Sequence, residues 1–148
     1  MDYVIRALRI ADYDAVLRLW QGTEGIGLNE SDDRCHVRSY LRRNPGMSFV
    51  VQHGGEIVGA VLCGHDGRRG YLHHLAVAKA HRKKGLGKKL VDAGLTELRR
   101  LKIQKCNIYL FADNAAGERF WKHDGWRKRD DLLVMQKNLA PTKNQCSC

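Results

Sequence analysis

Long apolar runs are missing from this sequence. No stretch approaches the roughly 20 consecutive apolar residues that a membrane-spanning helix needs. The opening residues, MDYVIRALRI, place an acid and arginines where a secretory signal would have its apolar segment. We therefore expect a soluble, cytoplasmic protein with no membrane partner.

The cysteines lack the spacing of zinc sites and redox motifs. There are five of them, an odd number, and no C-x-x-C occurs. Neither a disulfide framework nor a structural metal site is expected, so we predict no metal. Cys63 and Cys106 lie in apolar runs, which predicts buried side chains. Cys146 and Cys148 fall in the final NQCSC, within a tail over 140–148 that we predict to be loose.

Internal repeats and low-complexity linkers are also absent. The chain has 148 residues, of which 43% are hydrophobic and 28% charged. This balance is typical of a single globular domain with a sizeable core rather than of a disordered chain. We place that domain at residues 1–139.

Hydrophobic periodicity and turn residues predict the order β-α-α-β-β-β-α-β-α-β, an α/β fold with a mixed central sheet and helices on both faces. Asp12 and Ser31 are the expected N-caps of the first two helices, and His53-Gly54-Gly55 predicts a hairpin. Leu101 is expected on the inner face of the third helix with Leu90 and Leu98. The expected strands are 3–8, 47–52, 56–64, 70–78, 104–112 and 132–139, and the expected helices are 11–22, about 31–44, 86–102 and 114–125.

Positive charge is concentrated at one bend. The formal net charge is +10, and residues 81–89, HRKKGLGKK, hold four Lys and one Arg around two glycines. A strand that enters a glycine bend and then a helix is typical of phosphate sites, because the first helical N–H groups lack partners. A solvated basic turn is the alternative. The P-loop pattern is absent, and Leu90 stands where a dinucleotide fingerprint needs a third glycine.

The bend has the pattern R-x-x-G-x-G over Arg82–Gly87. It follows LHHLAV and precedes a helix, and some 27 residues after Gly87 comes NAAGERFWKHDGW. In this order the motifs resemble those of the GNAT superfamily of N-acetyltransferases, over residues 2–139. The segment GHDGRRGYLHHLAV is similar to small bacterial-type members near the ribosomal-protein alanine and N-terminal amine acetyltransferases. The resemblance implies the GNAT fold and transfer of an acetyl group from acetyl-CoA to an amine by direct attack.

The resemblance also implies which residues bind the cofactor. Backbone amides of the bend would hold the pyrophosphate, with Arg82 at its entrance. Backbone groups of the fourth strand would hold the pantetheine arm, and Asn114 would contact the cofactor while capping its helix. The implied cofactor-binding residues are Leu75, Val77, Arg82, Lys83, Lys84, Gly85, Leu86, Gly87, Lys88 and Asn114.

The catalytic residues are harder to assign. His73 and His74 are candidate bases because histidine titrates near neutrality, and strand alternation predicts that they lie on opposite faces. YLHHLAV is similar to H-L-H-A-L-A-V of arylalkylamine N-acetyltransferases, whose second histidine falls on His73. Tyr109 is a third candidate. For each of these side chains, simple packing is the alternative. The family's usual acid, a tyrosine, is replaced here by Trp121, which cannot supply a proton.

An acidic segment precedes the second predicted helix. It holds Glu24, Glu30, Asp32 and Asp33, which favour a cationic acceptor such as a polyamine, lysine or peptide amine, unless they are solvated residues at a helix start. Trp20 and Trp126 are candidate pocket residues.

Two alternative functions differ in how well the sequence fits them. One is a catalytically weak acyl-CoA-binding module that acts as sensor or scaffold. The other, nucleic-acid binding, is not expected, because the cations gather at one bend. A homodimer would fit the resemblance.

Overall fold

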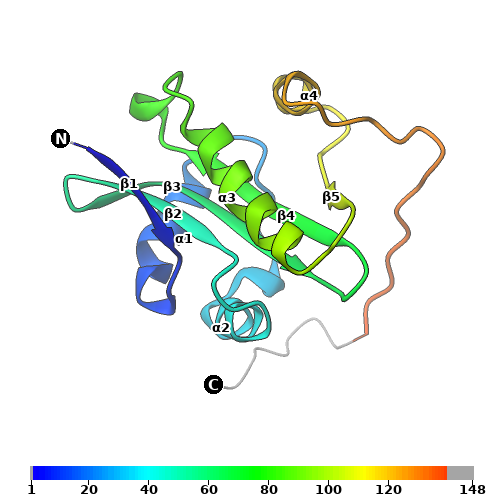
Figure 1. The fold of residues 1–148 in the computed structure, drawn as a ribbon, viewed down its shortest axis with the longest axis horizontal. Helices are drawn as coiled ribbons and strands as arrows, with labels where there is room; N and C mark the ends of the chain where they lie inside the picture. The colour runs from blue at the N-terminus through cyan, green and yellow to red at the C-terminus, as the bar shows by residue number, and fades with distance from the viewer. Residues whose placement is uncertain (1, 140–148) are drawn as a thin grey trace.

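The computed structural model describes residues 2–139, and it has a five-stranded sheet (Figure 1). The strands follow one another across the sheet in the order β1-β2-β3-β4-β5. The first three pairings are antiparallel and the last, between β4 and β5, is parallel. The mixed sheet predicted from the sequence is confirmed. The strands are β1 Tyr3–Ala7, β2 Phe49–His53, β3 Glu56–His65, β4 Gly70–Val77 and β5 Cys106–Ile108.

Helices cover both faces of the sheet. The helix α3 packs Leu90, Val91 and Leu98 against one face, and α1 packs Val16 and Trp20 against the other. Neighbouring strand residues turn to opposite cores, as side-chain alternation requires. The helices are α1 Tyr13–Gln21, α2 Arg34–Arg43, α3 Leu86–Arg100 and α4 Ala115–His123, with short 3-10 turns at η1 Ile10–Asp12, η2 Glu30–Asp32 and η3 Lys79–His81.

The connections between strands follow their expected chemistry. Gly54 and Gly55 both have positive φ, 57° and 83°, the conformation that a two-residue hairpin turn between β2 and β3 requires. The parallel strands β4 and β5 cannot be joined by a hairpin, and α3 makes the crossover between them. This crossover brings the basic bend to the end of β4.

Both predicted helix caps need correction. The Asp12 side chain does not cap α1; it accepts hydrogen bonds from the Arg6 guanidinium and from the Arg9 backbone N–H. The cap of α2 is Asp33, which accepts from the His36 N–H at 2.9 Å, and not Ser31. A 3-10 turn precedes each helix and shifts its start along the chain, which periodicity alone does not show.

The C-terminal part departs most from the predictions. Residues 132–139, predicted as the last strand, form no strand, and the predicted strand 104–112 shortens to Cys106–Ile108. Strand propensity stabilises a strand only where a partner pairs with it, and no strand of residues 2–139 pairs with 132–139. In Figure 1 this segment runs apart from the sheet. Leu101 is also half-exposed, because α3 ends at Arg100.

The cysteine prediction is corrected at one position. Cys35 is disulfide-bonded, although the spacing of the cysteines in the sequence does not indicate a disulfide framework. Cys63 is buried and free, and Cys106 is free and half-buried. Cys146, Cys148 and the predicted loose tail lie outside the described residues.

Two features of residues 2–139 concern metal binding and membrane spanning. Within this range no cluster of three or more His, Cys, Asp or Glu side chains is arranged to hold a metal ion. None of the helices described here has the length and apolar character to cross a membrane.

Candidate active site

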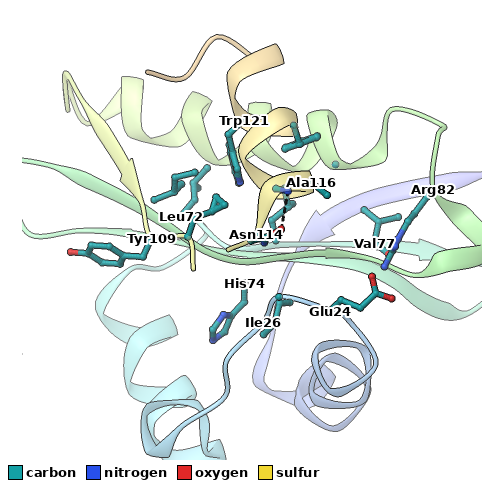
Figure 2. A pocket seen from close by; sticks show the side chains of 17 residues that line it. Glu24, Ile26, Leu72, His74, Val77, Arg82, Tyr109, Asn114, Ala116 and Trp121 are labelled. Atoms are coloured by element: carbon teal, nitrogen blue, oxygen red, sulfur yellow. Dashed lines mark hydrogen bonds between the residues drawn. The ribbon is translucent and has the colours of Figure 1, made fainter. Parts of the chain in front are cut away.

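A cavity of about 430 Å³ opens where β4 and β5 diverge. The two strands pair only from Gly70 to Leu72 of β4, because β5 ends at Ile108 while β4 continues to Val77. Figure 2 shows that the cavity reaches both sides of β4. His74 and Ile26 lie on one side, and Ala116 and Trp121 of α4 lie on the other.

A β-bulge reshapes β4 beside this cavity. His74 and Leu75 together oppose the single residue Val61 of β3, and His74 has a positive φ of 54°. The extra residue breaks the side-chain alternation. His73 and His74 therefore lie on the same face of the sheet, where the His73 ring faces Tyr40 of α2 and the His74 ring faces Trp20 of α1. The prediction of opposite faces was wrong.

Of the two histidines, His74 lines the cavity, whereas His73 is not among the lining residues. The His74 Nε2 lies 2.8 Å from Oδ1 of Asp32. Asp32 is only 7% exposed, so it is not the solvated acid that one interpretation of the sequence predicted. Its backbone C=O also accepts a hydrogen bond from the Tyr13 hydroxyl at 2.7 Å.

His73 lies in an aromatic cluster with Tyr71 and Tyr109, and of these three residues only Tyr109 lines the cavity. The His73 ring stacks with those of Tyr71 and Tyr109, each centroid 6.1 Å away. Burial lowers the pKa of His73, and the neighbouring His74 adds to this shift. Tyr109 lines the cavity, but it is 62% exposed, and Figure 2 shows its hydroxyl pointing away from the other lining side chains. Catalytic roles for His73 and Tyr109 stay predictions.

The open edge of β4 presents backbone groups to the cavity. The Ala78 N–H donates to the Val58 C=O at 2.7 Å, so this residue faces β3. Because successive residues of a strand direct their N–H and C=O groups to opposite edges, the backbone groups of Leu75 and Val77 face the cavity. The Arg82 Nε donates to the Val77 C=O at 2.9 Å. Arg82 therefore lines the cavity by reaching back to the strand.

The basic bend leads into an uncapped helix. Lys83 and Gly85 have φ values of 63° and 76°, and no side chain caps the N-terminus of α3. The amides of Leu86, Gly87 and Lys88 in the first turn have no acceptor within the helix.

The predicted residues of the bend are placed differently. Gly87 lines the cavity, and a Cβ added to it would lie 3.4 Å from the Phe120 ring. The Leu86 side chain is buried in the core, and Lys88 pairs with Asp92 and Asp124. Lys83, Lys84 and Gly85 form the adjoining bend outside the cavity.

The wall opposite β4 comes from α4 and from the loop after α1. Asn114 caps α4 by accepting from the Gly117 N–H at 2.9 Å, and it also lines the cavity. Gly25 lies against it, since a Cβ there would lie 2.7 Å from Asn114 Nδ2.

Sequence reasoning missed several wall residues and misplaced two tryptophans. Trp20 is 1% exposed in the core, and Trp126 packs on Trp121 with ring centroids 4.9 Å apart. Neither lines the cavity. The glycine at position 25 was the available signal for the loop, because a glycine can mark a close approach of two segments. No sequence pattern shows which segment it meets. Glu24 of the predicted acidic segment does line the cavity, and the wall residues that were missed include Gly25, Ile26, Ala116, Gly117 and Phe120.

This arrangement fits coenzyme A. The exposed strand edge can pair with an amide-bearing arm, and the uncapped helix start among cations can bind its phosphates.

Comparison with known proteins gives the family. The model of the family described as "Acetyltransferase (GNAT) family" matches residues 13–126. The chain belongs to this family. It is therefore an acetyl-CoA-dependent acetyltransferase. An acetyltransferase of Pectobacterium atrosepticum is 30% identical over 112 residues, 76% of this chain and 79% of that protein. One of Sodalis glossinidius is 26% identical over 135 residues, 91% and 94% of the two chains.

A solved structure extends the likeness to the fold. The PaiA N-acetyltransferase of Thermoplasma acidophilum, in complex with coenzyme A, superposes with a TM-score of 0.77. The match covers 88% of this chain and 92% of that one at 18% identity. At this identity the match shows a shared fold.

Proposed function

We propose that this protein is an N-acetyltransferase that moves the acetyl group of acetyl-CoA to a primary amine by direct attack. The acceptor is a small-molecule amine or the lysine or N-terminal amine of a peptide. The observation that carries the proposal is the open edge of β4 beside the uncapped start of α3. One side of this cavity suits the cofactor, and the His74 side suits the acceptor.

The chain's own groups would bind acetyl-CoA at two places. The backbone groups of Leu75 and Val77 pair with the pantetheine arm, and the amides of Lys83–Lys88, with Arg82, hold the pyrophosphate. The bound cofactor supplies the acetyl thioester. A strand N–H held rigidly by the sheet is a fixed donor to the thioester oxygen, which gains negative charge during attack.

The acceptor amine must be neutral before it attacks, so a base is needed. His74 is our choice, because it lines the cavity whereas the His73 ring lies in the aromatic cluster. Trp121 cannot protonate the leaving thiolate, and the hydroxyl of Tyr109 points away from the other lining side chains (Figure 2). Solvent at the cavity mouth therefore protonates the thiolate.

The alternative, a module that binds the cofactor without turnover, is less well supported. It requires the strand edge and the bend but gives no reason for a histidine–carboxylate pair at the cavity. The homodimer stays a prediction.

The test is an amine panel of spermidine, lysine and short peptides, incubated with acetyl-CoA. We expect thiol release that depends on the amine, with an acetylated amine found by mass spectrometry in equal amount. His74→Ala should lower kcat about 10²–10⁴-fold and leave acetyl-CoA affinity unchanged. Thiol release without an acetylated amine would contradict the proposal.

A further inference from the structure

We infer that Asp32 is a positioning residue, whose buried carboxylate holds the His74 ring so that Nδ1 accepts the proton of the acceptor amine. The inference rests on the proposed function, since His74 is the base there. Asp32 touches neither the amine nor acetyl-CoA, and it acts only through His74.

Asp32 is fixed before any substrate arrives. It is the third residue of η2, where its Oδ2 accepts from the Asn29 N–H at 3.1 Å. The Tyr13 hydroxyl of α1 donates to its backbone C=O. Asp32 is therefore held from two elements, through its carboxylate and through its backbone, and at 7% exposure it is largely shielded from water.

His74 is fixed from the other side. The bulge and the positive φ set its backbone, and the Trp20 ring meets its imidazole edge-on at 5.0 Å. A positive φ in a residue other than glycine is strained and persists only where the surroundings enforce it. Here the surroundings turn the ring toward Asp32.

The short contact also selects the tautomer. An ionised carboxylate only accepts hydrogen bonds, so the 2.8 Å contact places a hydrogen on His74 Nε2. The neutral ring then has its lone pair on Nδ1, because the one hydrogen bond that the His74 ring makes within residues 2–139 uses Nε2. A base whose second nitrogen is held by a carboxylate is the general arrangement for activating a nucleophile.

The proton balance is simple. The amine loses one N–H proton to Nδ1 as its nitrogen forms the bond to the acetyl carbon, and the imidazole becomes an imidazolium. The C–S bond of the thioester breaks, and the released thiolate takes a proton from solvent. The Asp32 carboxylate stays ionised and stabilises that cation at short range. The imidazolium then returns its proton to solvent.

Asp12 shows that such a carboxylate does not need a histidine partner. It is also the third residue of a 3-10 turn, is 9% exposed and accepts from the N–H of the turn's cap. Its side-chain partner is Arg6. Both carboxylates stabilise a turn, but only Asp32 contacts a titratable ring that lines the cavity.

Asp32→Asn tests the inference, with Asp12→Asn as the matched control. An asparagine whose oxygen bonds the Asn29 N–H presents an NH₂ group to Nε2, which favours the wrong tautomer. We expect kcat per folded molecule to fall at least about 10²-fold while the KM for acetyl-CoA changes less than about twofold. Asp12→Asn should lower stability and leave kcat unchanged.

Two further readouts separate positioning from a purely structural role. In the His74→Ala background, Asp32→Asn should cost no further activity, because the two residues act as a unit. Nitrogen NMR of the His74 ring should show Nε2 protonated and Nδ1 bare in the wild type, and a changed tautomer in Asp32→Asn. An unchanged kcat or an additive double variant would overturn the inference.

Failure of the proposed function looks different. A wild-type protein that acetylates no amine in the panel overturns the proposed function. The nitrogen NMR spectrum of the His74 ring still tests the Asp32–His74 pair in that case. A ring that carries its proton on Nδ1 overturns the inference even where turnover is normal.

Discussion

The part of the chain before β5 and the part after it are built differently. Within residues 2–139, every buried hydrophobic side chain lies between Leu8 and Leu98. Eight of the eleven exposed large hydrophobic side chains lie at or after Tyr109. Strand β5 has three residues, and α4 has no buried residue. The first part is a packed two-sided sheet, and the second is a short helix and an extended segment that lie beside it (Figure 1).

The active site lies at the boundary between these parts, and they contribute differently to it. The packed part supplies the groups that need fixed geometry: the edge of β4, the bulge, the Asp32–His74 pair and the start of α3. The second part supplies the wall of Asn114, Phe120 and Trp121. Because local stability follows burial, we expect the wall to open more readily than the base or the strand edge moves.

The largest effect on stability should come from a pair of leucines that differ only in the part they occupy. Leu90 is 0% exposed and Leu133 is 92% exposed. Leu90→Ala should lower the free energy of unfolding by about 2–5 kcal/mol through lost contacts and a cavity. Leu133→Ala should change it by less than about 0.5 kcal/mol. Urea denaturation of both variants measures this free energy. Equal losses in the two variants would contradict the difference between the two parts of the chain.

A smaller effect is expected from the partly buried ion pair of Arg6 and Asp12 in the packed part. The Arg6 guanidinium holds the pKa of Asp12 below its usual range through their hydrogen bonds. Asp12→Asn should therefore cost about 2 kcal/mol at neutral pH. A carboxylate with a lowered folded-state pKa loses its contribution as pH falls below about 4, the unfolded value. Thermal unfolding from pH 7 to pH 3 should show the variant and the wild type converging; a constant difference would contradict this.

The smallest effect concerns His73, which touches both parts through Tyr40 and Tyr109. Burial lowers its pKa, so the unfolded chain binds the proton first as pH falls below about 6.5. Stability is therefore lost below that pH. His73→Gln should lose less stability than the wild type between pH 7 and pH 5. Substitution of the exposed His123 is the control, and it should not alter how stability changes with pH. An unchanged pH dependence of stability in His73→Gln would contradict the contribution of His73.

Much of the fold could be predicted because its signals are local. The hairpin depends on two adjacent glycines, the start of α4 on Asn114, and the bend on residues 82–87. The predicted strand 132–139 failed because strand formation depends on a partner, and the sequence of a strand does not say whether one is present.

The pair at the cavity could not be predicted, for two physical reasons. The bulge is defined by how β4 pairs with β3, and a shift of one residue moves a side chain to the other face. Asp32 and His74 are 42 residues apart in the chain, and tertiary packing alone brings them together. The acid was visible in the sequence, but its burial was not.

The most direct test of the account is the acetyl-CoA affinity of Gly85→Val, with Gly46→Val as its control. Both glycines have left-handed φ, 76° and 72°, and a Cβ on either meets no atom within 4 Å. The two substitutions therefore impose similar backbone strain, but only Gly85 belongs to the bend before α3. Calorimetry should show acetyl-CoA binding lost in Gly85→Val and retained in Gly46→Val at matched folded fraction. Unchanged affinity in Gly85→Val, or equal loss in both variants, would contradict the assignment of this bend and helix start as the cofactor site.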